Sequence, residues 1–145
     1  MNQRNKPMKC ETIFYLANKT SLCKKALETE TEKLRVTSGA CHFATEPKKL
    51  GEHLITALKS NNIVFVIGGL GSNYGKISAE KVFSKALGNN LPSEIYKLKN
   101  PISSHKGYVI RKDGQIIVLL PDEPTEISEI FRCGLSDYFK SAVNK

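Results

Sequence analysis

The chain of 145 residues contains no tryptophan, only two methionines and four cysteines, and no apolar run as long as a membrane span. A bilayer crossing needs about 20 consecutive apolar residues, so no membrane-spanning helix is expected. The first seven residues carry charge with no apolar stretch behind it, unlike a secretory signal. These absences predict a cytoplasmic protein that makes no use of the membrane.

The cysteines and histidines are also too scattered to predict a metal site. Cys10, Cys23, Cys41 and Cys133 form no C-x-x-C motif and show no zinc-finger spacing. Cys41 and His42 are adjacent, and adjacent residues of a strand point to opposite faces of the sheet. We therefore expect reduced structural thiols, and neither a structural zinc ion nor any other resident metal.

What the chain has in excess is positive charge, with 22 Lys and Arg against 14 Asp and Glu, a formal net charge of +8. Such a balance suits nucleic acid, a small phosphate-bearing ligand, or solvated surfaces with no partner. Aromatic residues make up only 8% and do not interleave with a basic patch, as they do in single-strand binders. The low aromatic content therefore disfavours nucleic acid, and charge alone does not choose between a small anionic ligand and solvated surfaces.

The length and the 40% hydrophobic content predict one globular domain at residues 10–145, after a basic tail at residues 1–9. Helix and strand patterns alternate along this domain, which is typical of an α/β fold. Strands are expected at residues 12–17, 35–44, 63–67, 95–98, 107–111 and 115–120. Helices are expected at residues 20–34, 47–60 and 78–87, and after residue 124.

Two of these strand predictions are specific about position in the sheet. Residues 63–67, with the sequence IVFVI, are apolar at every position, which predicts a central, parallel strand buried on both faces. Residues 112–114, with the sequence KDG, lie between two strand patterns and predict a β-hairpin near the C-terminus.

The helix predictions include caps and buried faces. Thr20 or Ser21 is expected to cap the first helix and Thr45 the second, with Pro47 in the first turn of the second. The expected buried positions are Leu22, Ala26 and Leu27 in the first helix, and Leu50, Leu54, Ile55 and Leu58 in the second.

The first candidate site is the glycine loop at residues 68–75, with the sequence GGLGSNYG, between the buried strand and a predicted helix. Backbone N–H groups of such a loop can approach an anion closely. The loop matches neither the Walker A motif nor the Rossmann fingerprint. A tight turn without a ligand therefore stays an alternative. The candidate ligand-binding residues are Gly68, Gly69, Leu70, Gly71, Ser72, Asn73 and Lys76.

The second candidate site is the segment from Pro121 to Pro124, which follows another apolar strand. Asp122 and Glu123 could be paired carboxylates for a metal or a general base. The favoured alternative is structural: Asp122 caps the following helix, and Glu123 interacts with its dipole. Pro121, Asp122 and Pro124 complete the set of candidate ligand-binding residues.

Taken in order, these segments resemble the molybdopterin-binding (MoCF) domain. They are the strand ending in Gly68-Gly-Leu-Gly71, a helix, the hairpin beginning at Gly107-Tyr108, and the segment Ile116-Ile-Val-Leu-Leu-Pro121 followed by Pro124 and Glu126. The likeness covers roughly residues 36–139 and is nearest to the N-terminal domain of CinA-type competence-damage-inducible proteins, whose motifs are T-G-G-L-G-P-T-x-D-D and L-P-G-x-P. It implies a three-layer α/β/α domain with a mostly parallel sheet.

The same resemblance implies a ligand, and its departures concern catalysis. In the family the glycine loop binds the phosphate end of molybdopterin, or of an ADP-ribose-like nucleotide in the CinA-type branch. Gly75 and Lys76 stand where the family has two aspartates, and Asp122 replaces the glycine of L-P-G-x-P. Magnesium-assisted phosphate chemistry would need those aspartates, so neither Mg²⁺ nor catalysis is expected.

The sequence therefore predicts a domain that binds a pterin or a nucleotide, molybdopterin or an ADP-ribose-like molecule, without an intact catalytic site. One alternative is an active CinA-type nucleotide pyrophosphatase or a molybdenum-cofactor biosynthesis enzyme. Another is a non-catalytic scaffold that works through protein contacts. Family members commonly form dimers or trimers, so a homo-oligomer is a further expectation from the resemblance.

Overall fold

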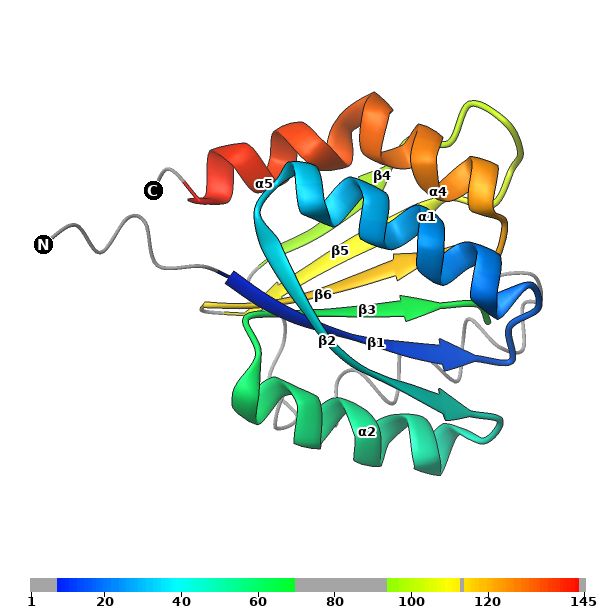
Figure 1. Ribbon diagram of the computed structural model, residues 1–145, viewed down its shortest axis with the longest axis vertical. Helices are drawn as coiled ribbons and strands as arrows, with labels where there is room; N and C mark the ends of the chain where they lie inside the picture. The colour runs from blue at the N-terminus through cyan, green and yellow to red at the C-terminus, as the bar shows by residue number, and fades with distance from the viewer. Residues whose placement is uncertain (1–7, 70–93, 113, 144–145) are drawn as a thin grey trace, which may run out of the picture.

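The computed structural model describes residues 8–69, 94–112 and 114–143 as three layers, with one sheet between two layers of helices (Figure 1). This is the α/β/α arrangement that the sequence predicted. The predicted helix at residues 78–87 and most of the glycine loop lie outside the described residues.

The described residues form a sheet of six strands in the order β2-β1-β3-β6-β5-β4. Their bounds are β1 Met8–Tyr15, β2 Val36–Ala44, β3 Ile63–Ile67, β4 Glu94–Leu98, β5 Gly107–Lys112 and β6 Gln115–Leu120. Strands β2, β1, β3 and β6 are parallel, and β5 runs antiparallel to both β6 and β4. The predicted central parallel strand is thus confirmed as β3, and the predicted hairpin as β5 and β6.

Helices cover both faces of this sheet. Helix α2, Pro47–Ser60, lies on one face, and α1, Thr20–Lys33, lies on the other beside α4, Pro124–Ile130 (Figure 1). A kinked segment, Phe131–Leu135, in which Gly134 has non-helical backbone angles, joins α4 to the last helix α5, Ser136–Val143. Within the described ranges, every helix is too short or too polar to span a bilayer.

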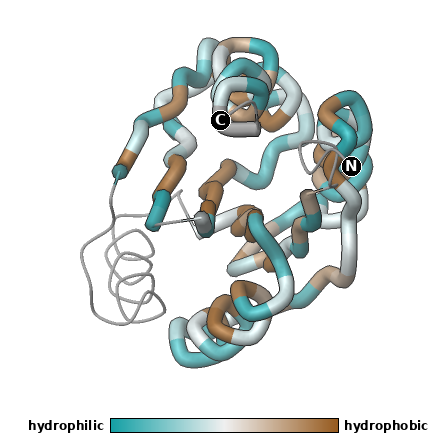
Figure 2. Tube along the Cα trace, turned by 90° about the vertical axis from the view of Figure 1, so that its left-hand side faces the viewer, coloured by the Kyte–Doolittle hydropathy of each residue, from teal (hydrophilic) through white to brown (hydrophobic). Residues whose placement is uncertain are grey.

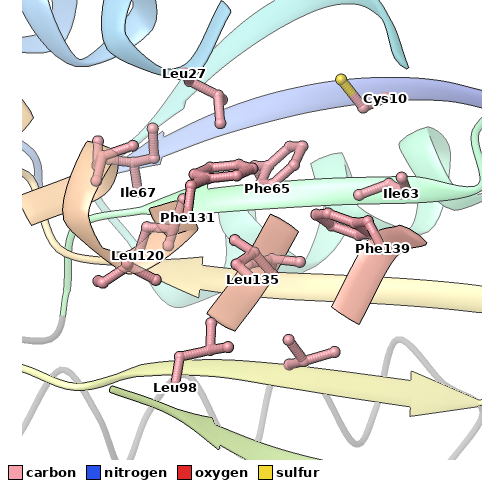
Figure 3. Packing of buried hydrophobic residues seen from close by; sticks show 14 of the residues in the cluster. Cys10, Leu27, Ile63, Phe65, Ile67, Leu98, Leu120, Phe131, Leu135 and Phe139 are labelled. Atoms are coloured by element: carbon pink, nitrogen blue, oxygen red, sulfur yellow. The ribbon is translucent and has the colours of Figure 1, made fainter. Parts of the chain in front are cut away.

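Each face of the sheet packs its own hydrophobic cluster. On the α1, α4 and α5 side, Phe65 of β3 contacts Phe131 and Phe139 at ring-centroid distances of 6.2 and 6.0 Å (Figure 3). On the α2 side, buried residues of α2 pack against β1, β3 and β6. Along the Cα trace, hydrophobic residues mark the strands at the centre and recur within the helices on both sides of the sheet (Figure 2). Burial on both faces explains why β3 has no polar residue.

The buried faces of the two long helices differ in part from the prediction. Leu22 and Ile55, both predicted to be buried, are 59% and 44% exposed. Cys23 in α1 and Ala57 in α2 are buried in their place. The prediction was therefore wrong at one position in each helix, where a small side chain faces the sheet. The buried positions Leu27, Leu50, Leu54 and Leu58 agree with the prediction.

The predicted caps are also wrong. Helix α1 has Lys19 at its N-cap and α2 has Glu46, and neither helix has a side-chain cap hydrogen bond. Pro47 does occupy the first turn of α2, as predicted. Strand β1 begins at Met8, so the sheet takes in Met8 and Lys9, which the prediction assigned to the tail.

Candidate functional site

The candidate site is the edge of the sheet at which β1, β3 and β6 end together. Ile67, the last residue of β3, pairs with Phe14 of β1 and with Leu120 of β6. The segments that follow these strands, residues 16–19, 68–69 and 121–123, therefore lie next to one another. The chain passes from β1 to β2 on one side and to β3 on the other, and α/β proteins bind ligands at such switch points.

The turn after β3 requires its two glycines. Gly68 has φ 105° and Gly69 has φ 73°, a region that disfavours residues with a Cβ atom. A Cβ on Gly68 would lie 2.2 Å from the carbonyl oxygen of Tyr15, and one on Gly69 would lie 2.7 Å from the Tyr15 ring. The Gly68 N–H donates to the Leu120 carbonyl over 2.9 Å. The other predicted loop residues, Leu70, Gly71, Ser72, Asn73 and Lys76, lie outside the described residues.

The turn after β6 carries Asp122 and Glu123, and Asp122 does not cap α4 as predicted, whereas Glu123 does lie at the N-terminus of that helix. The N-cap of α4 is Glu123, not Asp122, and it makes no side-chain cap hydrogen bond. Asp122 Oδ2 instead accepts a hydrogen bond from the Asn18 N–H over 2.8 Å. Glu123 forms an ion pair with Lys19, with Nζ and Oε1 2.5 Å apart. Both carboxylates thus hold the loop between β1 and α1.

That β1–α1 loop has an unusual backbone. Leu16 and Lys19 have φ angles of 50° and 52°, in the left-handed region that few residues other than glycine adopt. The Leu16 N–H donates to the Ala44 carbonyl over 3.1 Å, so the loop is fixed to β2 as well as to the β6–α4 turn. Cys23 lies beneath the loop, and burial, followed by the Asp122 and Glu123 charges, raises the pKa of its thiol to about 11.

A buried polar network stands beside the β6–α4 turn, and the sequence analysis did not find it. Glu126 accepts hydrogen bonds from Asn100 Nδ2 over 2.6 Å and from Ser103 Oγ over 2.5 Å. Asn100 also donates to the His105 carbonyl and accepts from the Ile102 N–H. The network fixes the β4–β5 connection against the start of α4. The one signal in the sequence was Glu126, which the motif comparison included without a partner.

The residues at this edge do not fit a metal ion as they are arranged. Asp122 and Glu123 already have N–H and ammonium partners. Within residues 8–69, 94–112 and 114–143, no three His, Cys, Asp or Glu side chains are grouped so that they could hold a metal ion. Gly75 and Lys76, which replace the family's two aspartates, lie outside the described residues.

Two of the histidines meet elsewhere, on the α2 side of the sheet. His42 lies 2.7 Å from Glu11, measured from Nε2 to Oε1, and its ring stacks on that of His53 at 4.8 Å. Asn61 donates to the second oxygen of Glu11. Cys41 packs against the opposite face, as expected for the neighbour of His42 in a strand. These contacts join α2 to β1 and β2, away from the candidate site.

Comparisons with known proteins place the fold. No protein-family model and no curated protein matches the sequence. A solved structure of CinA, with unknown function, from Thermoplasma acidophilum is 16% identical, with a TM-score of 0.68 over 90% of this chain and 98% of the other. The molybdopterin biosynthesis enzyme MoaB from Thermus thermophilus is 12% identical, with a TM-score of 0.71 over 95% and 98%.

A third solved structure, the tungsten cofactor synthesizing protein MoaB from Pyrococcus furiosus, is 16% identical, with a TM-score of 0.57 over 95% of this chain and 98% of the other. In all three comparisons the matched region includes nearly the whole of the other chain, so the likeness concerns an entire domain. The fold is therefore that of the CinA and MoaB structures, as the resemblance in sequence implied.

Proposed function

We propose that this protein binds a small phosphate-bearing ligand, a pterin or a nucleotide, at the carboxyl edge of β1, β3 and β6. The observation that carries the proposal is the turn Gly68–Gly69 at the end of the central strand. Its left-handed glycines let the backbone pass against Tyr15 with no side chain in between. The glycine-rich sequence continues to Gly75, and backbone N–H groups of a glycine-rich sequence can approach a phosphate closely.

The ligand class follows from charge and from likeness of fold. A formal net charge of +8 favours an anionic ligand. The similar structures include proteins named for molybdopterin biosynthesis and tungsten cofactor synthesis, which supports a pterin. The resemblance in sequence to the CinA-type branch supports an ADP-ribose-like nucleotide, and the solved CinA structure supports the likeness in fold alone. We propose binding without metal-dependent catalysis, because Gly75 and Lys76 replace the family's aspartates and the two carboxylates at the edge have other partners.

The test is a thermal-shift series with ADP-ribose, AMP, ATP, a pterin phosphate and inorganic phosphate, each with and without Mg²⁺. A ligand that binds only the folded state raises the melting temperature, by about 2.7 kcal/mol of stabilisation at a hundredfold excess over Kd. We expect a shift with at least one pterin or nucleotide, unchanged by EDTA. A shift that requires Mg²⁺ would instead indicate the enzyme alternative.

Two variants test whether the ligand binds at the glycine loop. Gly71→Asp adds a carboxylate to the glycine loop and should abolish the shift. Gly114→Asp adds the same group before β6, at the opposite edge of the sheet, where a Cβ atom has open space. This control should keep the shift. If no compound shifts the melting temperature, the glycine loop has a structural role only, and the scaffold alternative is favoured.

A further inference from the structure

The loop that carries Lys19 is packed directly against the glycine turn. A Cβ atom on Gly68 would lie 2.9 Å from Ala17 Cβ, so residue 17 touches the turn. Lys19 is two residues further along, and its side chain reaches across to Glu123 after β6. The β1–α1 loop therefore spans the space between the ends of β1 and β6, with the turn of β3 lying between them.

Lys19 is the only cation on the described residues of these three segments, 16–19, 68–69 and 121–123. Asp122 and Glu123 add two negative charges, so the described edge is net negative although the chain is basic. Within these described segments, the Asp122 and Glu123 carboxylates would oppose a phosphate at the Gly68–Gly69 turn, and Lys19 is the group that could offset them. Release of Lys19 from Glu123 would free a positive charge for an anion bound there.

The two carboxylates are held differently. Asp122 accepts a backbone N–H, which is fixed by the fold of the loop. The side chains of Lys19 and Glu123 are 50% and 40% exposed, and water screens an ion pair of this kind so that it contributes little to stability. The lysine ammonium is a compact charge on a flexible stem and can change partners without movement of the backbone.

Resting on the proposed function, we propose that Lys19 is a ligand-binding residue that exchanges Glu123 for a phosphate bound at the Gly68–Gly69 turn. Glu123 holds Lys19 while the site is empty and competes with the ligand for it. Asp122 keeps the loop in place through Asn18 during the exchange. The ligand class that this selects carries a terminal phosphate or diphosphate, whose oxygens accept from the ammonium group.

If Lys19 exchanges partners in this way, substitutions of Lys19 and of Glu123 should change the affinity for the ligand in opposite directions. Lys19→Gln should weaken binding of ADP-ribose or of a pterin phosphate, titrated separately, about tenfold, because a charge-assisted hydrogen bond is lost. Glu123→Gln should tighten binding by about threefold or more, because a competing negative charge is removed. Lys19→Arg should retain most of the affinity.

Matched controls come from the pair Lys33 and Glu30, whose charged atoms lie 3.3 Å apart in the last turns of the same helix. Lys33→Gln and Glu30→Gln should leave the affinity within twofold, and every variant should show the same melting temperature without ligand. If Lys19→Gln and Glu123→Gln both weaken binding, or both leave it unchanged, the exchange is refuted while the proposed function stands. If neither the wild type nor Glu123→Gln binds either probe, both proposals fail.

Discussion

The backbone N–H of Asn18 donates a 2.8 Å hydrogen bond to Oδ2 of Asp122, a residue 104 positions further along the chain. This contact joins the loop after the first strand to the turn after the last. Asn18 lies between Leu16 and Lys19, whose left-handed φ angles are unfavourable for residues other than glycine. The hydrogen bond to Asp122 therefore stabilises a loop conformation that the residues of the loop do not favour by themselves. The contact therefore links the stability of the fold to the shape of the candidate site.

Replacing Asp122 should show this link. Asp122→Ala removes the acceptor and should lower the free energy of unfolding by about 1 kcal/mol, the typical net contribution of one hydrogen bond. Asp122→Asn keeps an oxygen at this position and should cost less. Urea denaturation measures both values. Glu52→Ala, which breaks an exposed pair with Lys49, is the control; an equal loss there would mean that the Asn18 contact is not special.

Gly68→Ala should be among the most damaging single substitutions in the chain. The added Cβ would lie 2.2 Å from the Tyr15 carbonyl oxygen, at a φ angle of 105° that alanine rarely adopts. We expect a loss of about 3 kcal/mol or more in the free energy of unfolding. Gly114→Ala, where a Cβ meets nothing within 4 Å, should be neutral or slightly stabilising. Similar urea midpoints for the two variants would contradict the close approach.

The buried network predicts a specific sensitivity at Asn100. Asn100→Ala leaves Glu126, which is 6% exposed, with one donor fewer and also frees the His105 carbonyl. The expected loss is about 2 kcal/mol, since a buried carboxyl group keeps only its Ser103 donor and a carbonyl loses its partner. Ser104→Ala, at an exposed position of the same connection, should change stability by less than about 0.5 kcal/mol. If Asn100→Ala and Ser104→Ala have the same urea midpoint of unfolding, the network does not stabilise the fold.

Burial of Cys10 predicts a dependence of stability on alkaline pH. Desolvation raises the pKa of this thiol to about 11, whereas an unfolded thiol ionises near pH 8.5, about its ordinary value. The stability that the buried thiol contributes is therefore fully present below about pH 8.5 and is lost as the pH rises toward 11.

The measurement is the free energy of unfolding in urea at pH 8 and pH 10.5, with a reductant present. The wild type should lose about 2 kcal/mol more than Cys10→Ala between the two pH values. Cys133→Ala, at a partly exposed cysteine, should lose as much as the wild type. Equal losses in the wild type and Cys10→Ala would show that the thiol is not desolvated.

The sequence predicted the elements of the fold where burial leaves a pattern. Strand β3 is apolar at every position because both of its faces are covered, and its predicted bounds, residues 63–67, agree with the structure. The hairpin of β5 and β6 was equally clear from its turn residues. Helix α1 was less clear, because its buried side includes Cys23 and Thr31, which a search for large apolar residues passes over.

The candidate site could be predicted only in part, because periodicity does not say which loops meet. The two turns at the ends of β3 and β6 were found from glycine and proline. The partners of their side chains were not, since Asn18, Lys19 and Asn100 are distant in sequence from the residues that they bind. An asparagine or a lysine in a loop resembles any solvated residue until the fold supplies its partner.

The place of β3 in the sheet has a consequence for how the chain is made. One neighbour of β3 is β1, already synthesised, but the other is β6, whose residues 115–120 emerge from the ribosome much later. Until then, the strand IVFVI presents an open, wholly apolar edge, the kind of surface on which nascent chains aggregate. The yield of folded protein should therefore depend on chaperones, and on the time that translation needs to reach residue 120.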